Sequence, residues 1–191
     1  MNIFNNLVDI PLDFENKKLK DIFKDKNNKT LKDTISHNRY IKFSSYIYKK
    51  YSQYLDMPLG KFLYILKQND DMFYKKFLNK YGDLEYSNFK ILDKKYQDLK
   101  GVYFYYLNDK LKYIGRCKDS MKKRVNSGYG RISAKKCFID GQATNCKVNA
   151  LVTKNIGNIK LKIFVMDDNK AIEKLESELI EEFDPIWNSR K

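Results

Sequence analysis

The stretch that decides the fold is Gly101–Gly115, which reads GVYFYYLNDKLKYIG. It contains two runs rich in β-branched and aromatic residues, Val102–Leu107 and Leu111–Gly115, and such residues favour strands. Asn108 and Asp109, between the runs, tolerate the backbone of a tight turn. The stretch therefore predicts a β-hairpin.

The rest of the C-terminal half is expected to add helices and one further strand. The expected segments are a helix at Lys118–Val125, a basic glycine-containing loop at Asn126–Gly141, a helix at Thr144–Lys154, a strand at Ile159–Met166, and a helix capped by Asp167 or Asp168 that runs to about Phe183. Pro185 follows this last helix, and the residue before a proline disfavours the helical conformation. Residues 101–191 are therefore expected to form an α+β domain with a small mixed sheet and flanking helices.

Residues 1–100 are expected to form a mostly helical region. The helices that the apolar spacing predicts are Arg39–Leu55, Pro58–Gln68 and, after a cap at Asn69–Asp71, Met72–Tyr81. The region holds ten of the 15 tyrosines of the chain. Either these tyrosines form an ordinary core with hydrated hydroxyl groups, or some of them contact DNA together with lysines. DNA binding and dimerisation are both candidate roles for this region.

The chain is strongly basic, with a formal net charge of +14 over 191 residues. Leu111–Lys162 holds 13 Lys and Arg residues against two acids, whereas Ile163–Lys191 has four bases and eight acids. Such a concentration of positive charge favours a polyanionic partner, either nucleic acid or an anionic membrane. A membrane surface would require a basic amphipathic helix or a lipidation motif, and neither is found. Nucleic acid is therefore the expected partner.

Arginine is scarce in this lysine-rich chain and its positions are uneven. Three of the five arginines, Arg116, Arg124 and Arg131, lie between positions 116 and 131. The planar guanidinium binds phosphate through a fork of donors that lysine lacks. The cluster indicates phosphate contact, although chance grouping of so few residues would give the same pattern.

Several classes of site are excluded by the residues that the chain lacks. The single histidine, His37, leaves no HNH nuclease chemistry, no His-based zinc site and no Ser-His-Asp triad. Cys117, Cys137 and Cys146 lack zinc-site spacing and are expected as small core residues in a reducing cytoplasm. There is no Walker A loop or G-x-G-x-x-G motif, so no nucleotide cofactor is expected. We find no apolar run long enough for a membrane span and no secretory signal at the start, so a cytoplasmic location without a membrane partner is expected.

Glu176 is the most informative residue of the last predicted helix. The apolar stripe of this helix consists of Ile172, Leu175, Leu179, Ile180 and Phe183. Glu176 falls inside the stripe, whereas the other glutamates of the helix fall outside it. A carboxylate on a buried face is costly unless it meets a cation or hydrogen-bond donors. Three explanations are open: a structural pair with Lys or Arg, a metal site, or a catalytic acid or base.

Several motifs of the C-terminal half occur in a fixed order. Gly101-Val-Tyr103 is followed, after nine residues, by Tyr113-Ile-Gly115, and Arg124 lies in the next predicted helix. Glu176 heads an E-x-x-L-I segment, and a P-x-x-N segment closes the chain at Pro185 and Asn188. Together these elements resemble the GIY-YIG nuclease family, over about residues 101–191. The basic insertion, with Gly128–Ile132 and Thr144-Asn145, is more similar to the restriction-type and phage endonuclease branches than to the excision-repair branch.

The resemblance implies a metal-dependent endonuclease that hydrolyses phosphodiester bonds of DNA. One divalent ion, Mg²⁺ or alternatively Mn²⁺, would be held by Glu176, since Mg²⁺ keeps several of its water ligands. Tyr103 would be the general base, and its pKa, ordinarily near 10, would have to be lowered by the ion, Arg116 and Arg124. Arg124 would also clamp the scissile phosphate. The remaining implied roles are the orientation of water or phosphate by Tyr113 and Tyr129, and supporting positions for Gly101, Gly115 and Asn188.

Basic residues around these motifs are expected to contact the DNA backbone. They are Lys118, Lys122, Lys123, Arg131, Lys135, Lys136 and Lys147. The alternative for at least half of them is plain solvation. Likewise, Tyr103 and Tyr113 could simply pack the sheet, and Arg124 could be an exposed helix charge.

The expected role is restriction-type, site-specific cleavage of double-stranded DNA. Two alternatives stay open: a mobile-element or repair nuclease that recognises DNA structure, and a DNA-binding module whose nuclease core is inactive. One active site of this kind cuts one strand, so cleavage of both strands would suggest a homodimer.

Overall fold

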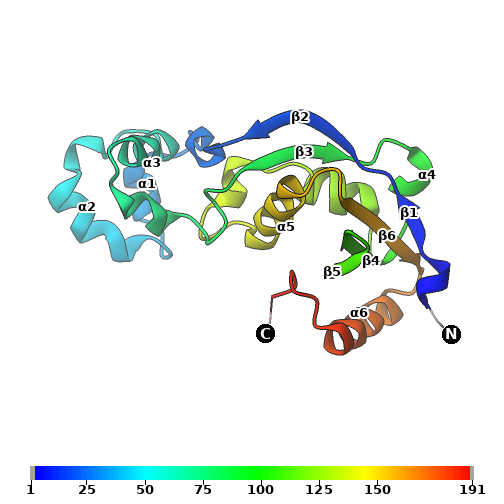
Figure 1. Cartoon of the computed structure of the whole chain (residues 1–191). Coiled ribbons are helices and arrows are strands. Elements are labelled where there is room, and N and C mark those ends of the chain that lie inside the picture. Colours follow the sequence, from blue (N-terminus) through cyan, green and yellow to red (C-terminus); the bar gives the residue numbers. More distant parts are fainter. Residues whose placement is uncertain (1–2, 190–191) are drawn as a thin grey trace. The chain divides into compact units, whose positions relative to one another are not determined.

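The computed structural model describes residues 3–189 and has an α+β fold built on a four-stranded sheet (Figure 1). The strands are β1 (Val8–Ile10), β4 (Gly101–Leu107), β5 (Lys110–Cys117) and β6 (Ile159–Val165), in the order β1-β6-β4-β5. The predicted hairpin and the third strand are thus confirmed. The expectation of a mixed sheet was wrong, because every neighbouring pair is antiparallel.

The hairpin turn has the backbone that its sequence predicts. Asn108 and Asp109 have φ angles of 48° and 58°. A two-residue turn with both φ angles positive matches the right-handed twist of the strands it joins. The turn residues therefore fix the hairpin register, in which Tyr103 pairs with Gly115.

The chain divides into two compact units. The sheet unit contains the described residues up to Lys17, Ser87–Arg131 and the residues from Leu151 on; the helical unit contains Lys18–Tyr86 and Ile132–Ala150. These units do not follow the division expected at residue 100. The start of the chain belongs to the sheet unit because β1 pairs with β6.

The remaining elements are helices, short helical turns and a two-stranded sheet. The sheet consists of β2 (Asp13–Leu19) and β3 (Tyr86–Lys90). The α-helices are α1 (Leu31–Ile35), α2 (Ser44–Lys50), α3 (Leu59–Gln68), α4 (Lys94–Gln97), α5 (Ala143–Lys154) and α6 (Asn169–Phe183). The 3-10 turns are η1 (Ile3–Asn6), η2 (Ile22–Asp25), η3 (Ile41–Phe43), η4 (Ser52–Tyr54), η5 (Met72–Phe77) and η7 (Ala134–Cys137), and η6 (Lys122–Tyr129) is a π-helix.

These elements confirm some sequence predictions and correct others. The helices expected after Pro58, over Thr144–Lys154 and after Asp168 are present, and the Asp168 side chain accepts hydrogen bonds from two backbone N–H groups of α6. The single helix expected over Arg39–Leu55 is instead three short segments. The first hundred residues also contain three strands that their apolar spacing did not predict.

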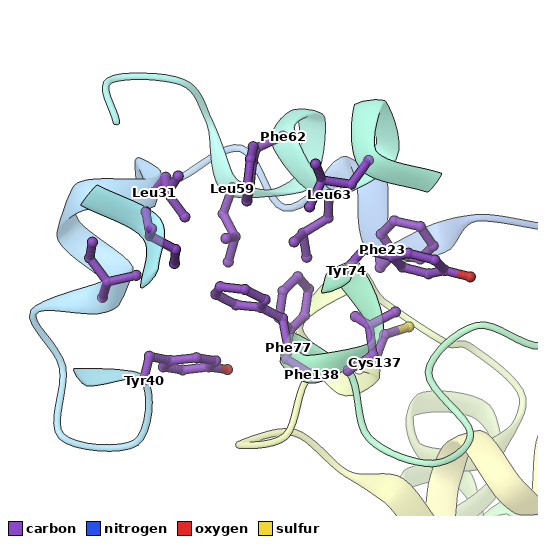
Figure 2. Packing of buried hydrophobic residues seen from close by; sticks show 14 of the residues in the cluster. Phe23, Leu31, Tyr40, Leu59, Phe62, Leu63, Tyr74, Phe77, Cys137 and Phe138 are labelled. Atoms are coloured by element: carbon purple, nitrogen blue, oxygen red, sulfur yellow. The ribbon is translucent and has the colours of Figure 1, made fainter. Parts of the chain in front are cut away.

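The helical unit has its own core, in which side chains of α1, α3 and η5 interdigitate (Figure 2). Some predicted core tyrosines are buried here with their hydroxyl groups bonded: Tyr40 donates to Asp140, Tyr51 to Asp71 and Tyr74 to Asp83. Others, including Tyr46 and Tyr48, are exposed. The segment Ile132–Ala150 joins this unit because Phe138 and other residues of the segment lie in the same core.

The sheet unit buries a second apolar cluster between the sheet and α6. Val102 and Phe104 of β4 pack with Ile114 of β5 and with Ile172 and Leu179 of α6. Since side chains alternate along a strand, Tyr103 and Tyr105 project to the opposite face of the sheet. All three cysteines are buried and free, as expected for core residues. Within residues 3–189, no helix combines the length and the apolar character needed to cross a membrane.

Candidate active site

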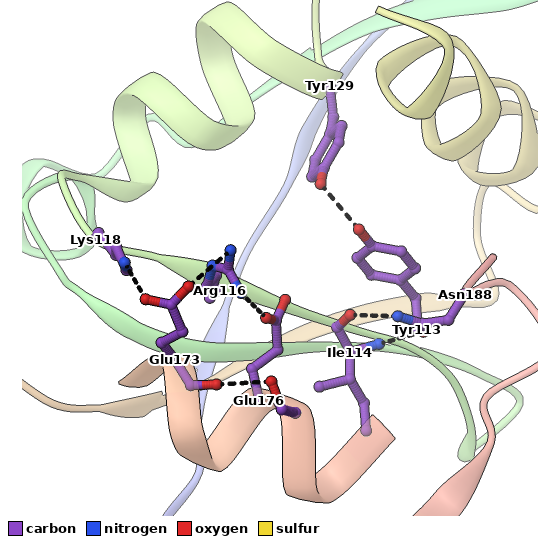
Figure 3. A network of polar contacts seen from close by, with 9 residues as sticks. Tyr113, Ile114, Arg116, Lys118, Tyr129, Glu173, Glu176 and Asn188 are labelled. Carbon is purple, nitrogen blue, oxygen red and sulfur yellow. Dashed lines mark hydrogen bonds and ion pairs between the residues drawn. The ribbon is translucent and has the colours of Figure 1, made fainter. Parts of the chain in front are cut away.

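Three of the predicted site residues form a chain of hydroxyl groups. The Tyr103 and Tyr129 hydroxyls are 2.7 Å apart. The Tyr113 and Tyr129 hydroxyls are 3.2 Å apart (Figure 3). The three phenol rings are buried and contact one another edge to face or tilted. Tyr129 thus links the tyrosines of the two hairpin strands.

The π-helix η6 explains the spacing of Arg124 and Tyr129. A π-helix is closed by bonds between residues five apart, and here the Gly130 N–H donates to the Val125 carbonyl over 2.7 Å. A residue five positions after Arg124 therefore lies about one turn away. The helix predicted to end at Val125 continues to Tyr129, so the loop that was expected from Asn126 on begins later.

Arg124 is exposed at the edge of this tyrosine cluster. Its guanidinium forms no ion pair with a carboxylate of residues 3–189. It is close enough to the phenols for its charge to act on the pKa of Tyr103. An unpaired guanidinium beside hydroxyl groups is a suitable site for a phosphate.

Glu176 has a cationic partner in the structure. Its Oε2 atom accepts a hydrogen bond from Arg116 Nη1 over 2.6 Å, and its side chain is 14% exposed (Figure 3). Arg116 also pairs with Glu173 over 3.2 Å, and Glu173 in turn pairs with Lys118 over 2.5 Å. The structural pair considered for Glu176 is therefore present, and it leaves Oε1 without a hydrogen-bond partner within residues 3–189.

The edge strand β5 brings the carboxylate and the tyrosines near each other. Arg116 and Ile114 lie on the face of β5 that α6 covers, and Tyr113 lies on the opposite face. Burial raises the pKa of Tyr113, and the charge of Glu176 contributes to the same rise. Glu176 thus lies within electrostatic reach of the hydroxyl chain.

The pKa of Tyr103 is raised, contrary to the expectation of a lowered value. Burial is the main cause, and the neighbouring Tyr129 and Tyr113 add to it, while the charge of Arg124 acts in the opposite direction. Arg116 is not positioned to lower the pKa of Tyr103, because its guanidinium forms ion pairs with Glu173 and Glu176. Hydroxyl groups enclosed by aromatic rings ionise with difficulty, and one nearby cation does not offset that.

Two residues of this site were missed by the sequence predictions. Tyr105 packs against Tyr103, Tyr113 and Tyr129, and its hydroxyl is the one buried side-chain polar atom without a hydrogen-bond partner among residues 3–189. Its position two residues after Tyr103 places it on the same face of β4, which the alternation of a strand could have indicated. The second missed residue is Glu173. It lies outside the apolar stripe of α6, so its sequence position did not indicate a role in the site.

The two predicted glycines are required by close contacts. A Cβ atom at Gly115 would lie 2.4 Å from the Tyr103 hydroxyl. At Gly101 it would lie 1.9 Å from the Phe164 carbonyl, and the φ angle of +143° disfavours other residues as well. Both glycines therefore leave room for the hairpin and for the phenol chain.

Asn188 ties the end of the described chain to the edge strand. Its Oδ1 atom accepts from the Ile114 N–H over 3.0 Å, and its Nδ2 atom donates to the Ile114 carbonyl over 2.8 Å (Figure 3). The side-chain amide thereby replaces a neighbouring strand on the outer side of β5. Asn188 thus holds the end of the described chain against β5.

We expect Asn188→Ala to lower the free energy of unfolding by about 1–3 kcal/mol, because it leaves two backbone groups of a partly buried strand unpaired. Asn188→Asp keeps the acceptor and loses the donor, so its loss should be smaller. The free energy of unfolding of both variants can be measured by urea unfolding followed by circular dichroism. Equal stability of the alanine variant and the wild type would show that water replaces these bonds without cost.

The basic residues predicted to contact DNA do not all lie in one unit. Lys118, Lys122, Lys123 and Arg131 belong to the sheet unit, whereas Lys135, Lys136 and Lys147 belong to the helical unit. Lys122 and Lys123 are exposed, and Lys118 is held by Glu173. Lys136 and Lys147 are half-buried, and Lys147 lies over the Tyr81 ring. These two are therefore poorer candidates for DNA contact than their sequence position suggested.

The donor set at Glu176 is compatible with a hydrated magnesium ion. Within residues 3–189 no three His, Cys, Asp or Glu side chains form a group that could hold a metal. Mg²⁺ does not need such a group, because it keeps several waters and accepts one or two carboxylates. Glu176 could hold it through the Oε1 atom that Arg116 leaves free.

No family model matches the chain, and neither a curated protein nor a solved structure is similar to it at a significant level.

Proposed function

We propose that the sheet unit is a metal-dependent endonuclease of the GIY-YIG type, which hydrolyses phosphodiester bonds of double-stranded DNA. The observation that supports this most is the arrangement around β5. It combines a chain of three phenol hydroxyls with the Arg124 guanidinium and the Glu176 carboxylate. Within residues 3–189, the guanidinium has no carboxylate partner and one oxygen of Glu176 accepts no hydrogen bond. A metal-dependent phosphodiester hydrolase needs a base for the attacking water, positive charge at the phosphate and a ligand for the metal ion, and these groups can supply all three.

Each group has a distinct role in this proposal. Arg124 binds the non-bridging oxygens of the scissile phosphate. Tyr103, in its ionised form, takes a proton from the water whose oxygen bonds to phosphorus, and Tyr113 and Tyr129 orient that water through their hydroxyl groups. Glu176 would hold Mg²⁺ or Mn²⁺, and such an ion would supply positive charge that offsets the negative charge developing at the phosphate. As the new bond to phosphorus forms, the bond between phosphorus and the sugar oxygen breaks, and that oxygen takes a proton from solvent water. Arg116 balances the charge of Glu176 in the free protein.

Restriction-type cleavage at a defined sequence is the favoured form of this activity. The test is incubation of the protein with plasmid and phage DNA in Mg²⁺. Discrete fragments support site-specific cleavage, whereas a smear, or nicking confined to branched substrates, supports a mobile-element or repair nuclease. Fragments cut on both strands would further suggest that two copies of the chain act together.

One observation favours a second candidate, a DNA-binding module without cleavage. The raised pKa of Tyr103 and the pair between Arg116 and Glu176 leave neither an ionised phenol nor a fully free carboxylate in this arrangement. The test is incubation of the protein with duplex DNA in Mg²⁺ or Mn²⁺ from pH 7 to pH 9. Binding of the DNA without any cleavage would support this candidate and overturn the nuclease proposal.

The raised pKa of Tyr103 predicts a rising pH profile. If its phenolate is the base, the reactive fraction and the cleavage rate should increase about tenfold per pH unit below that pKa. We expect Tyr103→Phe to lower the rate by about 10²-fold and to flatten the profile. Tyr105→Phe is the matched control, since it removes a buried hydroxyl that has no partner among residues 3–189, and it should keep the slope.

The stability of the folded protein limits the pH range over which these rates can be measured. The folded state binds the phenolic proton more tightly than the unfolded state, so stability is retained below the ordinary tyrosine pKa near 10 and falls as the pH rises above it. Initial rates between pH 7 and pH 9 are therefore informative. An unchanged slope in Tyr103→Phe would remove Tyr103 from the role of base.

A further inference from the structure

Most of the net positive charge lies in the helical unit, which contains none of the groups of the candidate active site. The unit holds 18 Lys and Arg residues against nine acids, whereas the rest of the chain holds 20 against 15. The helical unit thus carries +9 of the total charge of +14. This excess indicates that the unit itself has an anionic partner.

Part of this charge lies in a stretch without acidic residues. No Asp or Glu occurs between Asp33 and Asp56, and the bases in between are Arg39, Lys42, Lys49 and Lys50. Lys50 is neutralised by Asp71 at 3.1 Å. The other three bases are exposed and form no ion pair with a carboxylate of residues 3–189.

The helical segment formed by η3 and α2 directs these bases to one side. Ile47 is fully buried and Phe43 is half-buried, so they mark the inner side of the segment. The residues of the outer side, which we call the α2 face, are Ile41, Lys42, Ser45, Tyr48 and Lys49. Their spacing of three, four and seven residues is that of one helical stripe.

Exposure and anchoring both favour a binding role for this face. Ile41 is 55% exposed and Tyr48 is 51% exposed, which is high for such large side chains. The neighbouring Tyr46 ring packs on Phe73 with centroids 4.7 Å apart, and Tyr51 packs on the same ring. The segment is thus held firmly from its inner side while its outer side stays open to solvent.

The chemistry of the α2 face fits a phosphate backbone. Lysine ammonium groups and the hydroxyl groups of serine and tyrosine are among the donors that bind phosphate oxygens of DNA. The α2 face supplies both kinds through Lys42, Lys49, Ser45 and Tyr48. No carboxylate of the stretch would repel the phosphates. A membrane surface would require a wide apolar face, whereas Ile41 is the only aliphatic residue here.

We propose that the α2 face, together with Arg39, binds the backbone of double-stranded DNA without reading its sequence. The choice of DNA as the polyanion rests on the proposed nuclease function. Binding at this face would hold the substrate through the helical unit while the chemistry takes place in the sheet unit.

The test is fluorescence anisotropy of a labelled mixed-sequence DNA duplex with the full chain in EDTA, so that cleavage does not interfere. The variant Lys42→Ala/Lys49→Ala is compared with Lys29→Ala/Lys61→Ala, which removes the same charge from exposed lysines elsewhere in the helical unit. We expect the first variant to lose about tenfold or more in affinity. We also expect the slope of log K against log salt to become shallower by about 1.8, as for two lost phosphate contacts. Thermal unfolding checks that both variants fold.

The outcomes separate this inference from the proposed function. Equal affinity and salt slope in the two double variants would overturn the role of the α2 face, even if the wild type cleaves DNA. A loss confined to the first variant supports the role, even if no cleavage occurs in Mg²⁺. Tighter binding of an RNA duplex than of the DNA duplex would contradict the choice of DNA.

Discussion

Arg124→Ala should lower the rate of DNA cleavage by about 10³-fold, because the guanidinium is the cation best placed to meet the charge that develops on the phosphate. Arg124 is exposed, pairs with no carboxylate of residues 3–189 and lies within electrostatic reach of Tyr103, Tyr113 and Tyr129. Binding of DNA should fall only a few-fold, since one phosphate contact among several is lost. The measurement is single-turnover nicking of supercoiled plasmid in Mg²⁺.

Two further variants sharpen this prediction. Arg124→Lys keeps the charge and loses the fork of donors, so it should recover a small part of the rate. Lys94→Ala, which removes an exposed charge from another part of the sheet unit, should cleave like the wild type. If Arg124→Ala cleaves DNA at the rate of the wild type, Arg124 has no role in the reaction.

Glu176→Gln should also lower cleavage by about 10³-fold, because a neutral amide binds Mg²⁺ far more weakly than a carboxylate. The variant should still fold, since Arg116 keeps Glu173 as its partner and the amide oxygen can accept the same hydrogen bond. Binding of duplex DNA in EDTA should remain close to that of the wild type. Cleavage and binding measured side by side separate loss of chemistry from loss of substrate.

The matched control is Glu178→Gln, on the same helix but exposed and paired with Lys174 at 3.8 Å. It should retain full activity. A purely structural role of Glu176 predicts a different result: a lower melting temperature with an unchanged cleavage rate. That result would remove the carboxylate from the mechanism.

The elements that the sequence predicts well are those fixed by local chemistry. Asn108 and Asp109 determine a two-residue turn, so the hairpin follows from neighbouring residues alone. The last helix is defined by its cap at Asp168 and by an apolar stripe in which Glu176 does not belong. The presence of a cation beside Glu176 could be expected from the cost of burying its charge.

The features that the sequence does not predict depend on contacts between distant segments. The pairing of β1 with β6 joins residues more than 150 positions apart through a strand of three residues. The basic segment Ile132–Ala150 belongs to the helical unit because its apolar residues enter that core. Neither contact leaves a periodic signal in the sequence.

The pKa shift of Tyr103 and the position of Tyr129 could not be predicted from the sequence either. The sign of the pKa shift of Tyr103 depends on how completely the phenols enclose one another and on Arg116 turning toward two carboxylates. The place of Tyr129 depends on the wider turn of η6, which no residue pattern indicated. Both results follow from packing in three dimensions.

The most direct test compares the purified wild type with the double variant Arg124→Ala/Glu176→Gln, prepared in parallel, on supercoiled plasmid with Mg²⁺, Mn²⁺ or EDTA. If the groups around β5 hydrolyse DNA, the wild type cuts the plasmid with either ion and not in EDTA, and the double variant leaves it intact. Cleavage by both proteins at equal rates, or an uncut plasmid with the wild type and both ions, would contradict the proposed nuclease.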